Sequence, residues 1–258
     1  MLVTVKGIVI GRREIGDNNC FLDVFTDKLG MVEVMAHGVK KLGGRNSAAA
    51  SMFSYADFCL NKKGTSYYTI NSTEPIYNFY DIANSLEAFS LAVYFADLIK
   101  YCATSEEEHG ELLRFVCMAF YQLEKAKLPL DFIKSIFEFR FITHIGFMPD
   151  LRACQQCACY TDDVMYFLPN EGMIYCENCF KTFVRGTDSF QIDPTVLHIL
   201  RYVAYSDNEK LFKFKISPKY EKIFSDITEF YLQSQLGRTF DTLRYYKDLQ
   251  LDYFNQEE

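Results

Sequence analysis

The first 75 residues alternate hydrophobic and polar positions with the two-residue period of half-buried strands. Short runs rich in Val, Ile, Phe and Tyr are separated by turn-forming residues, and they cover residues 3–10, 20–26, 31–36, 55–61 and 66–71. Five strands in so short a stretch favour a small closed barrel, because closure leaves no exposed sheet edge. Pro75 is predicted to close this region.

After Pro75 the hydrophobic period changes to that of amphipathic helices. Three stripes have this spacing: Leu86, Phe89, Val93 and Ala96; Leu113, Val116, Phe120 and Leu123; Ile133, Ile136, Phe137, Phe141 and Ile145. Two later helices are predicted to begin at Asp193-Pro194 and Ser217-Pro218, where a capping side chain precedes a proline at the first helical position. The pattern predicts an α+β multidomain chain, with a five-stranded barrel in residues 1–78 and a helical domain in 79–258.

Composition agrees with a folded chain of one or two domains. The sequence has 258 residues, of which 49% are hydrophobic and 24% charged, which excludes wholesale disorder. The apolar run from Ala88 to Ala96 is too short to span a bilayer. The start, MLVTVKGIVIGRRE, has no small-residue cleavage site and is typical of a strand rather than a signal peptide. We therefore expect a cytoplasmic protein without a membrane partner.

Charge is distributed unevenly along the chain. The net charge is −7, but residues 1–75 hold nine basic and seven acidic side chains, against 18 and 27 in the rest. Between Val34 and Ala56 the sequence has three basic residues and no acidic one. These are Lys40, Lys41 and Arg45, in a connection that is long for a small barrel and therefore a candidate functional loop.

The spacing of four cysteines is the strongest chemical signal. Cys154 and Cys157 are followed by Cys176 and Cys179 in the pattern C-x2-C-x18-C-x2-C, which is typical of a zinc site. Four thiolates complete a tetrahedral Zn²⁺ shell, so one zinc ion would be structural rather than catalytic. Residues 150–182 are expected to form this zinc unit, with strands at 164–168 and 172–175 as a hairpin. Cys159 stays open as a poorer replacement for Cys157.

Other candidate residues each have a structural alternative. Phe21, Phe25 and one of Tyr67 and Tyr68 are either base-stacking rings or ordinary core and surface residues. Arg140 is either a cation in a groove for an acidic peptide or an arginine at a helix edge. The sequence has only four histidines and no Walker A, dinucleotide-binding, HExxH or GxSxG motif, so catalytic residues are not expected.

The order of these parts, a small β-barrel, a helical body, a four-cysteine unit and a helical tail, resembles the bacterial RecO family of DNA repair and recombination mediators. Four segments carry the resemblance: VTVKGIVIGRREIGDNNCFLDVFTDKLGMVEVMAHGVKK at the start, FEFRFITHIGFMPDLRACQQC before the first cysteine pair, GMIYCENC around the second, and GRTFDTLRYYKDL near the end. The resemblance covers nearly the whole chain.

The resemblance implies an N-terminal OB-fold, a helical domain with an inserted zinc unit, and no enzymatic activity. It further implies a bacterial, nucleoid-associated protein that binds single- and double-stranded DNA and anneals complementary strands. The family contacts the acidic C-terminal tail of single-stranded DNA-binding protein and, with RecR, helps load RecA recombinase onto coated DNA. Its DNA-contacting positions after the third strand correspond to Lys40, Lys41 and Arg45.

Two other functions compete with this expectation. The net negative charge of the chain is compatible with a protein-interaction scaffold that has a structural zinc site and binds little DNA itself. A metal-dependent enzyme acting on nucleic acid would need a metal with an open coordination position, and four cysteine ligands leave none.

Overall fold

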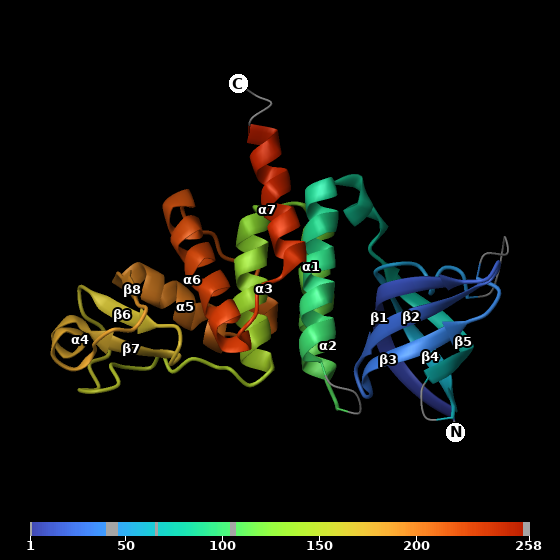
Figure 1. Cartoon of the computed structure of the whole chain (residues 1–258), viewed down its shortest axis with the longest axis horizontal. Coiled ribbons are helices and arrows are strands. Elements are labelled where there is room, and N and C mark those ends of the chain that lie inside the picture. The colour runs from blue at the N-terminus through green and yellow to red at the C-terminus, as the bar shows by residue number, and fades with distance from the viewer. Residues whose placement is uncertain (1, 40–45, 65–66, 104–106, 255–258) are drawn as a thin grey trace. The chain divides into compact units, whose positions relative to one another are not determined.

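The computed structural model describes residues 2–39, 46–64, 67–103 and 107–254. The chain forms two compact units, Met1–Lys127 with Phe240–Glu258, and Leu128–Thr239. The first unit combines a β-barrel with three helices, and the second combines helices with a small sheet (Figure 1). The predicted α+β class is therefore confirmed, whereas the predicted domain boundary after residue 78 stays a prediction.

The barrel of the first unit is closed in the strand order β1-β2-β3-β5-β4. Its strands are β1 (Leu2–Ile15), β2 (Asn19–Thr26), β3 (Gly30–Ala36), β4 (Ser54–Lys63) and β5 (Tyr67–Asn78). All pairs are antiparallel except β3 with β5. The interior is filled by alternate apolar side chains, among them Val9, Leu22, Val34, Phe58 and Leu60. Strand alternation thus leaves the other side chains for the outer face.

Pro75 does not end the last strand as the sequence pattern predicts. β5 continues to Asn78, and the pairing with β4 shifts at this point because Tyr55 opposes Tyr77 while Ala56 opposes Pro75. Proline is tolerated in a sheet at such an irregularity, where no ladder hydrogen bond from its nitrogen is needed. The residues after Pro75 therefore belong to the barrel.

Three helices pack in the same unit as the barrel: α1 (Leu86–Cys102), α2 (Gly110–Lys125) and α7 (Asp241–Phe254), with a short 3-10 turn η1 (Tyr80–Asn84) before α1. Phe53, which follows the 40–45 segment, contacts Phe89 of α1 and Phe120 of α2 at 5.7 and 5.1 Å between ring centroids. The backbone N–H of His109 donates to Asp27 O at 2.7 Å. These contacts connect the barrel to the helices.

The second unit contains α3 (Leu130–His144), α5 (Pro194–Tyr205), α6 (Pro218–Leu236) and the short η2 (Asn208–Lys210). Its sheet has the order β7-β6-β8, from β6 (Met165–Leu168), β7 (Met173–Cys176) and β8 (Phe190–Ile192), with α4 (Glu177–Phe183) after β7. Asp193 caps α5 by accepting from Val196 N at 2.9 Å, as its sequence predicts.

Candidate nucleic-acid interface and metal centre

The outer face of the barrel brings one phenylalanine and one tyrosine together. Phe21 of β2 and Tyr67 of β5 are half-buried, and their rings meet edge to face at 5.4 Å and 82°. Tyr68 instead packs against the barrel core, which settles which of the two tyrosines faces outward. Phe25 is fully buried and lies against His109 at 5.5 Å between ring centroids, so of the two interpretations of Phe25 the structure supports the core residue.

Several described cations of the barrel are paired with acidic residues. Lys6 binds Asp57 at 3.1 Å, and Arg12 binds Glu14 at 2.9 Å. Arg13 forms an ion pair with Glu33, and its guanidinium also lies 5.7 Å from the Phe21 ring centroid. Lys6, Arg12 and Arg13 are therefore paired with carboxylates of the barrel itself.

The predicted DNA-binding residues Lys40, Lys41 and Arg45 lie outside the described residues. The residues on either side are anchored to the barrel. Val39 N donates to Asn18 O at 3.0 Å, next to the β1–β2 turn, and the Thr73 hydroxyl of β5 donates to Asn46 Oδ1 at 3.2 Å. Val39, the last described residue before the basic segment, thus lies next to Asn18, which precedes β2.

The structure gathers the sulfurs of Cys154, Cys157, Cys176 and Cys179 within 4.8 Å of one another. Two of these residues belong to the turn before β6, whereas Cys176 ends β7 and Cys179 lies in the first turn of α4. The Cys157 and Cys176 sulfurs are 3.7 Å apart. A Zn–S bond of ~2.3 Å in a tetrahedron gives an S–S edge of about 3.8 Å, so the four thiols fit a metal ion.

The local backbone explains why Cys157 rather than Cys159 joins the group. Ala158 adopts a left-handed conformation with φ of 59°, and its N–H donates to Cys154 O at 2.9 Å. This turn directs the next cysteine away, and the Cys159 thiol donates to Thr161 O at 3.0 Å. The four-cysteine cluster therefore includes Cys157 and not Cys159.

The electrostatics of the thiols favour a bound cation. Burial raises the pKa of Cys154, but backbone hydrogen bonds from Cys157, Cys176 and Gln156 outweigh it and lower the pKa to about 7. Burial, together with hydrogen bonding to the neighbouring thiols, raises the pKa of Cys179. Four adjacent thiols cannot all ionise without a positive charge among them, and a divalent metal would provide that charge.

Contacts in the second unit hold the cysteine-bearing segments in place. The rings of Tyr166 in β6 and Phe180 in α4 stack at 3.8 Å and 3°. Arg201 of α5 donates to Leu151 O at 2.7 Å and Tyr160 O at 2.5 Å, while its guanidinium lies 4.0 Å from the Tyr160 ring centroid. The turn that carries the first cysteine pair is therefore fixed to α5.

Arg140 of α3 is half-buried and forms hydrogen bonds within the second unit. Its guanidinium donates to Ala204 O of α5 at 2.5 Å and to Asn208 Oδ1 at 3.0 Å. A cation at these last carbonyl groups stabilises the C-terminus of α5. This structural contact accounts for its position.

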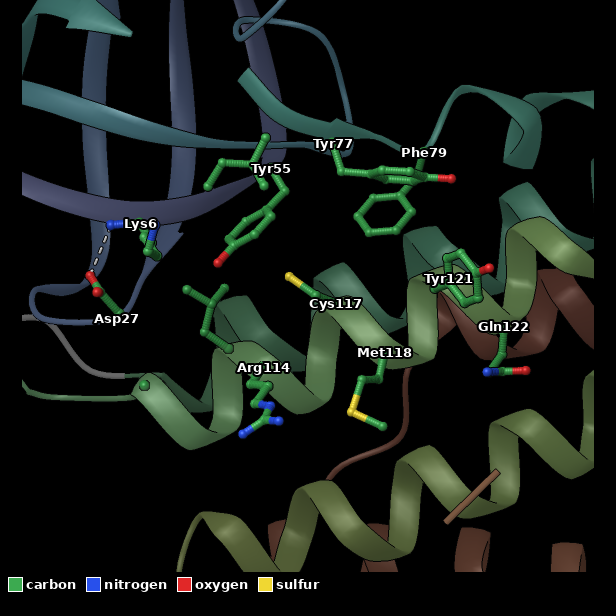
Figure 2. A pocket seen from close by; sticks show the side chains of 13 residues that line it. Lys6, Asp27, Tyr55, Tyr77, Phe79, Arg114, Cys117, Met118, Tyr121 and Gln122 are labelled. Atoms are coloured by element: carbon green, nitrogen blue, oxygen red, sulfur yellow. Dashed lines mark hydrogen bonds between the residues drawn. The ribbon is translucent and has the colours of Figure 1, made fainter. Parts of the chain in front are cut away.

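A cavity of about 660 Å³ in the first unit was not predicted from the sequence. Figure 2 shows Tyr55, Tyr77 and Phe79 from the barrel end opposite Cys117, Met118 and Tyr121 of α2. Burial raises the pKa of Tyr55 to about 12, so its hydroxyl stays protonated. The lining is mainly apolar, which is typical of a surface for another molecule. Its residues come from several barrel segments and from α2, and no local sequence pattern reveals their packing.

The sequence as a whole was also compared with known proteins. The family model "Recombination protein O N terminal" matches residues 1–79, and "Recombination protein O C terminal" matches residues 83–244. The chain belongs to the recombination protein O (RecO) family. The barrel falls within the first match, and the four cysteines fall within the second.

Curated relatives support membership of the RecO family over nearly the whole length. A "DNA repair protein RecO" of Alkaliphilus metalliredigens is 28% identical over 92% of this chain and 95% of its own length. Proteins of the same name from Acetivibrio thermocellus and Halalkalibacterium halodurans are 25% and 24% identical, over 95% and 100% of this chain and 96% and 99% of their own lengths. These names mention DNA repair and no metal, so the four-cysteine site of this RecO chain rests on its own geometry.

The RecO chain has no membrane-spanning candidate among the helices of residues 2–39, 46–64, 67–103 and 107–254: each is too short or too polar to cross a bilayer.

Proposed function

We propose that this chain is a non-enzymatic mediator of DNA repair and recombination, located in the bacterial cytoplasm at the nucleoid. It binds single- and double-stranded DNA, anneals complementary strands and, with RecR, helps load RecA onto DNA coated by single-stranded DNA-binding protein. The partners are those that the RecO family implies. The observation that supports the DNA-binding part is the sequence between Val34 and Ala56, which has three basic residues and no acidic one and connects β3 to β4 of the barrel.

Lys40, Lys41 and Arg45 are proposed to bind the phosphate backbone. Three cations without an intervening acidic residue release counterions when they bind DNA, and this gain does not depend on the base sequence. The two strands of a pair can therefore be held by the same residues before they anneal. An overall charge of −7 opposes this binding, so we expect modest affinity that falls steeply with salt.

The four cysteines are proposed to bind one structural Zn²⁺. Bound zinc would supply folding free energy to residues 150–182, which contain too little apolar surface to form a core of their own. With all four positions taken by sulfur from Cys154, Cys157, Cys176 and Cys179, no position is left for an activated water. We therefore assign the metal no part in chemistry.

A protein-interaction scaffold with little DNA binding is the second candidate function. The cavity beside α2 favours it, because apolar walls of this kind suit a peptide or helix of a partner protein. RecR and the tail of single-stranded DNA-binding protein are the partners to test. This alternative and the mediator proposal differ in whether the isolated protein binds DNA at low salt.

Strand annealing tests the proposed function directly. Two complementary oligonucleotides, each coated with the cognate single-stranded DNA-binding protein, are mixed with wild-type protein or with the Lys40→Ala/Lys41→Ala/Arg45→Ala variant. We expect wild type to accelerate annealing and the variant to lose most of that acceleration, with an unchanged melting temperature. Equal annealing by both proteins would refute the assignment of these three residues. No DNA binding by wild type even at low salt would favour the scaffold.

A further inference from the structure

The four cysteines of the proposed zinc site differ in exposure. Three of them are buried, with exposed fractions of 2%, 5% and 5% for Cys154, Cys176 and Cys179. Cys157 is exposed, as is the rest of the turn that carries it, residues 155–158. A reagent dissolved in water therefore reaches this ligand more easily than the other three.

The backbone holds the exposed thiol beside a buried one. Gln155 N donates at 2.9 Å to the carbonyl oxygen of Ile174, two residues before Cys176 in β7. The sulfurs of Cys157 and Cys176 are 3.7 Å apart. A disulfide bond is ~2.05 Å long, so these two atoms need to approach by only about 1.7 Å to be joined. The turn and the strand are thus already arranged for a bond between the two sulfurs.

We propose that Cys157 is an oxidation site, at which a hydroperoxide such as hydrogen peroxide converts the cluster into a Cys157–Cys176 disulfide and releases the zinc. The oxidation site goes beyond the mediator function and rests on the proposed zinc site. Coordination keeps the thiols deprotonated, and thiolates rather than thiols are the nucleophiles that are oxidised. Release of the metal withdraws the folding free energy that it supplies to residues 150–182, so the oxidised protein is less stable.

The oxidation takes place in two steps. The Cys157 thiolate attacks one oxygen of hydrogen peroxide, the O–O bond breaks, and a sulfenic acid and a hydroxide ion result. The Cys176 thiolate then attacks the sulfenic sulfur, which forms the S–S bond and expels a second hydroxide ion. Two protons from the solvent convert the hydroxide ions into water. The two sulfurs lose two electrons and the peroxide gains them, and zinc dissociates from the two ligands that remain.

Peroxide treatment of the zinc-loaded, full-length protein tests this site. The protein is purified under reducing conditions, freed of reductant and treated with hydrogen peroxide, while a chromogenic chelator measures the released zinc. Free thiols are then blocked with N-ethylmaleimide. A protease that cleaves before Asp162 and Asp163 separates Cys157 from Cys176 unless a disulfide joins them, and mass spectrometry detects the joined peptides. We expect about one such disulfide for each zinc ion released, and reversal of both by dithiothreitol with added zinc.

Two variants identify the thiol that reacts. Cys157→His keeps a ligand at this position, because three cysteines and one histidine also form structural zinc sites. It should bind zinc but release it about fivefold more slowly in peroxide, since the remaining three thiolates are buried. Cys159→Ser is the matched control, because it removes a partly exposed thiol that hydrogen-bonds to Thr161 O outside the cluster. It should release zinc at the wild-type rate.

The outcomes separate the oxidation site from the zinc site on which it rests. Wild type without zinc after reducing purification refutes the zinc site, and the oxidation site fails with it. Zinc-loaded wild type that keeps its metal in peroxide, or loses it without forming the Cys157–Cys176 disulfide, overturns only the oxidation site. Release at the wild-type rate from Cys157→His, or slower release from Cys159→Ser, also overturns it. If Cys157→His does not fold, the disulfide found in wild type decides the matter.

Discussion

At the scale of one residue, Lys134 is buried although hydrophobic periodicity does not predict its burial. The stripe of Ile133, Ile136, Phe137 and Phe141 predicts one buried face, yet α3 also buries Lys134 and Glu138. The ammonium group lies 3.1 Å from both Glu138 Oε2 and Glu229 Oε2 and 3.2 Å from Ser225 Oγ. A charged residue in the sequence is expected to face water. The burial of Lys134 is tolerable because partners on α3 and α6 together surround its ammonium group.

Removing the cation from this cluster should destabilise the second unit strongly. Lys134→Met leaves the buried Glu138 carboxylate without its counter-charge, which typically costs about 3–5 kcal/mol of unfolding free energy. Lys134→Met/Glu138→Leu removes both buried charges and should recover part of that loss. Lys222→Met, an exposed lysine of α6, is the control and should change stability by less than about 0.5 kcal/mol. Urea unfolding at pH 7 measures all three.

The same cluster gives a dependence on pH. Burial alone would lower the pKa of Lys134, but the two carboxylates outweigh it and raise the pKa above 10.5. A raised pKa in the folded state stabilises the protein below the unfolded-state pKa, and the gain is lost as pH rises through the folded value. Wild type should therefore lose stability above pH 10.5 relative to the double variant. An equal alkaline loss in both proteins would contradict this assignment.

At the scale of elements, the hairpin between the cysteine pairs was predictable, whereas its neighbour was not. The alternating residues at 164–168 and 172–175 correspond to β6 and β7, which pair with Met165 opposite Cys176. β8 has only three residues, Phe190–Ile192, too few for a periodic signal. The choice between Cys157 and Cys159 depends on the left-handed turn at Ala158, which sequence spacing does not specify.

Metal analysis tests the four-cysteine element. Wild-type protein should contain about one zinc per chain, and Cys176→Ser should release it and lower the thermal stability of the second unit, because metal binding contributes to folding. Cys159→Ser is the matched control, since its thiol hydrogen-bonds to Thr161 O outside the cluster, and it should keep its zinc. A full zinc content in the Cys176→Ser protein would exclude this ligand set.

At the scale of the whole molecule, the order of barrel, helices and cysteine unit was visible in the sequence. The sequence did not reveal that the C-terminal helix α7 belongs to the same unit as the barrel. α7 packs on α1 in the first unit, and the Thr242 hydroxyl donates to Asp97 Oδ2 at 2.9 Å. Periodicity predicts the apolar face of a helix and not the helix that covers it. Contacts over such a separation depend on the complete fold, as do the residues that line the cavity beside α2.

The uneven charge of the chain gives a prediction that belongs to the whole molecule. If the basic segment binds phosphates, affinity for single-stranded DNA should fall linearly with salt on a double logarithmic plot, and Lys40→Ala/Lys41→Ala/Arg45→Ala should reduce the slope by about 2. The control Lys213→Ala/Lys215→Ala/Lys219→Ala removes three exposed cations from the second unit and changes the net charge equally. It should leave the slope nearly unchanged, because counterions are released only where phosphates are contacted. The same reduction in both variants would show that net charge, rather than the basic segment of the barrel, governs DNA binding.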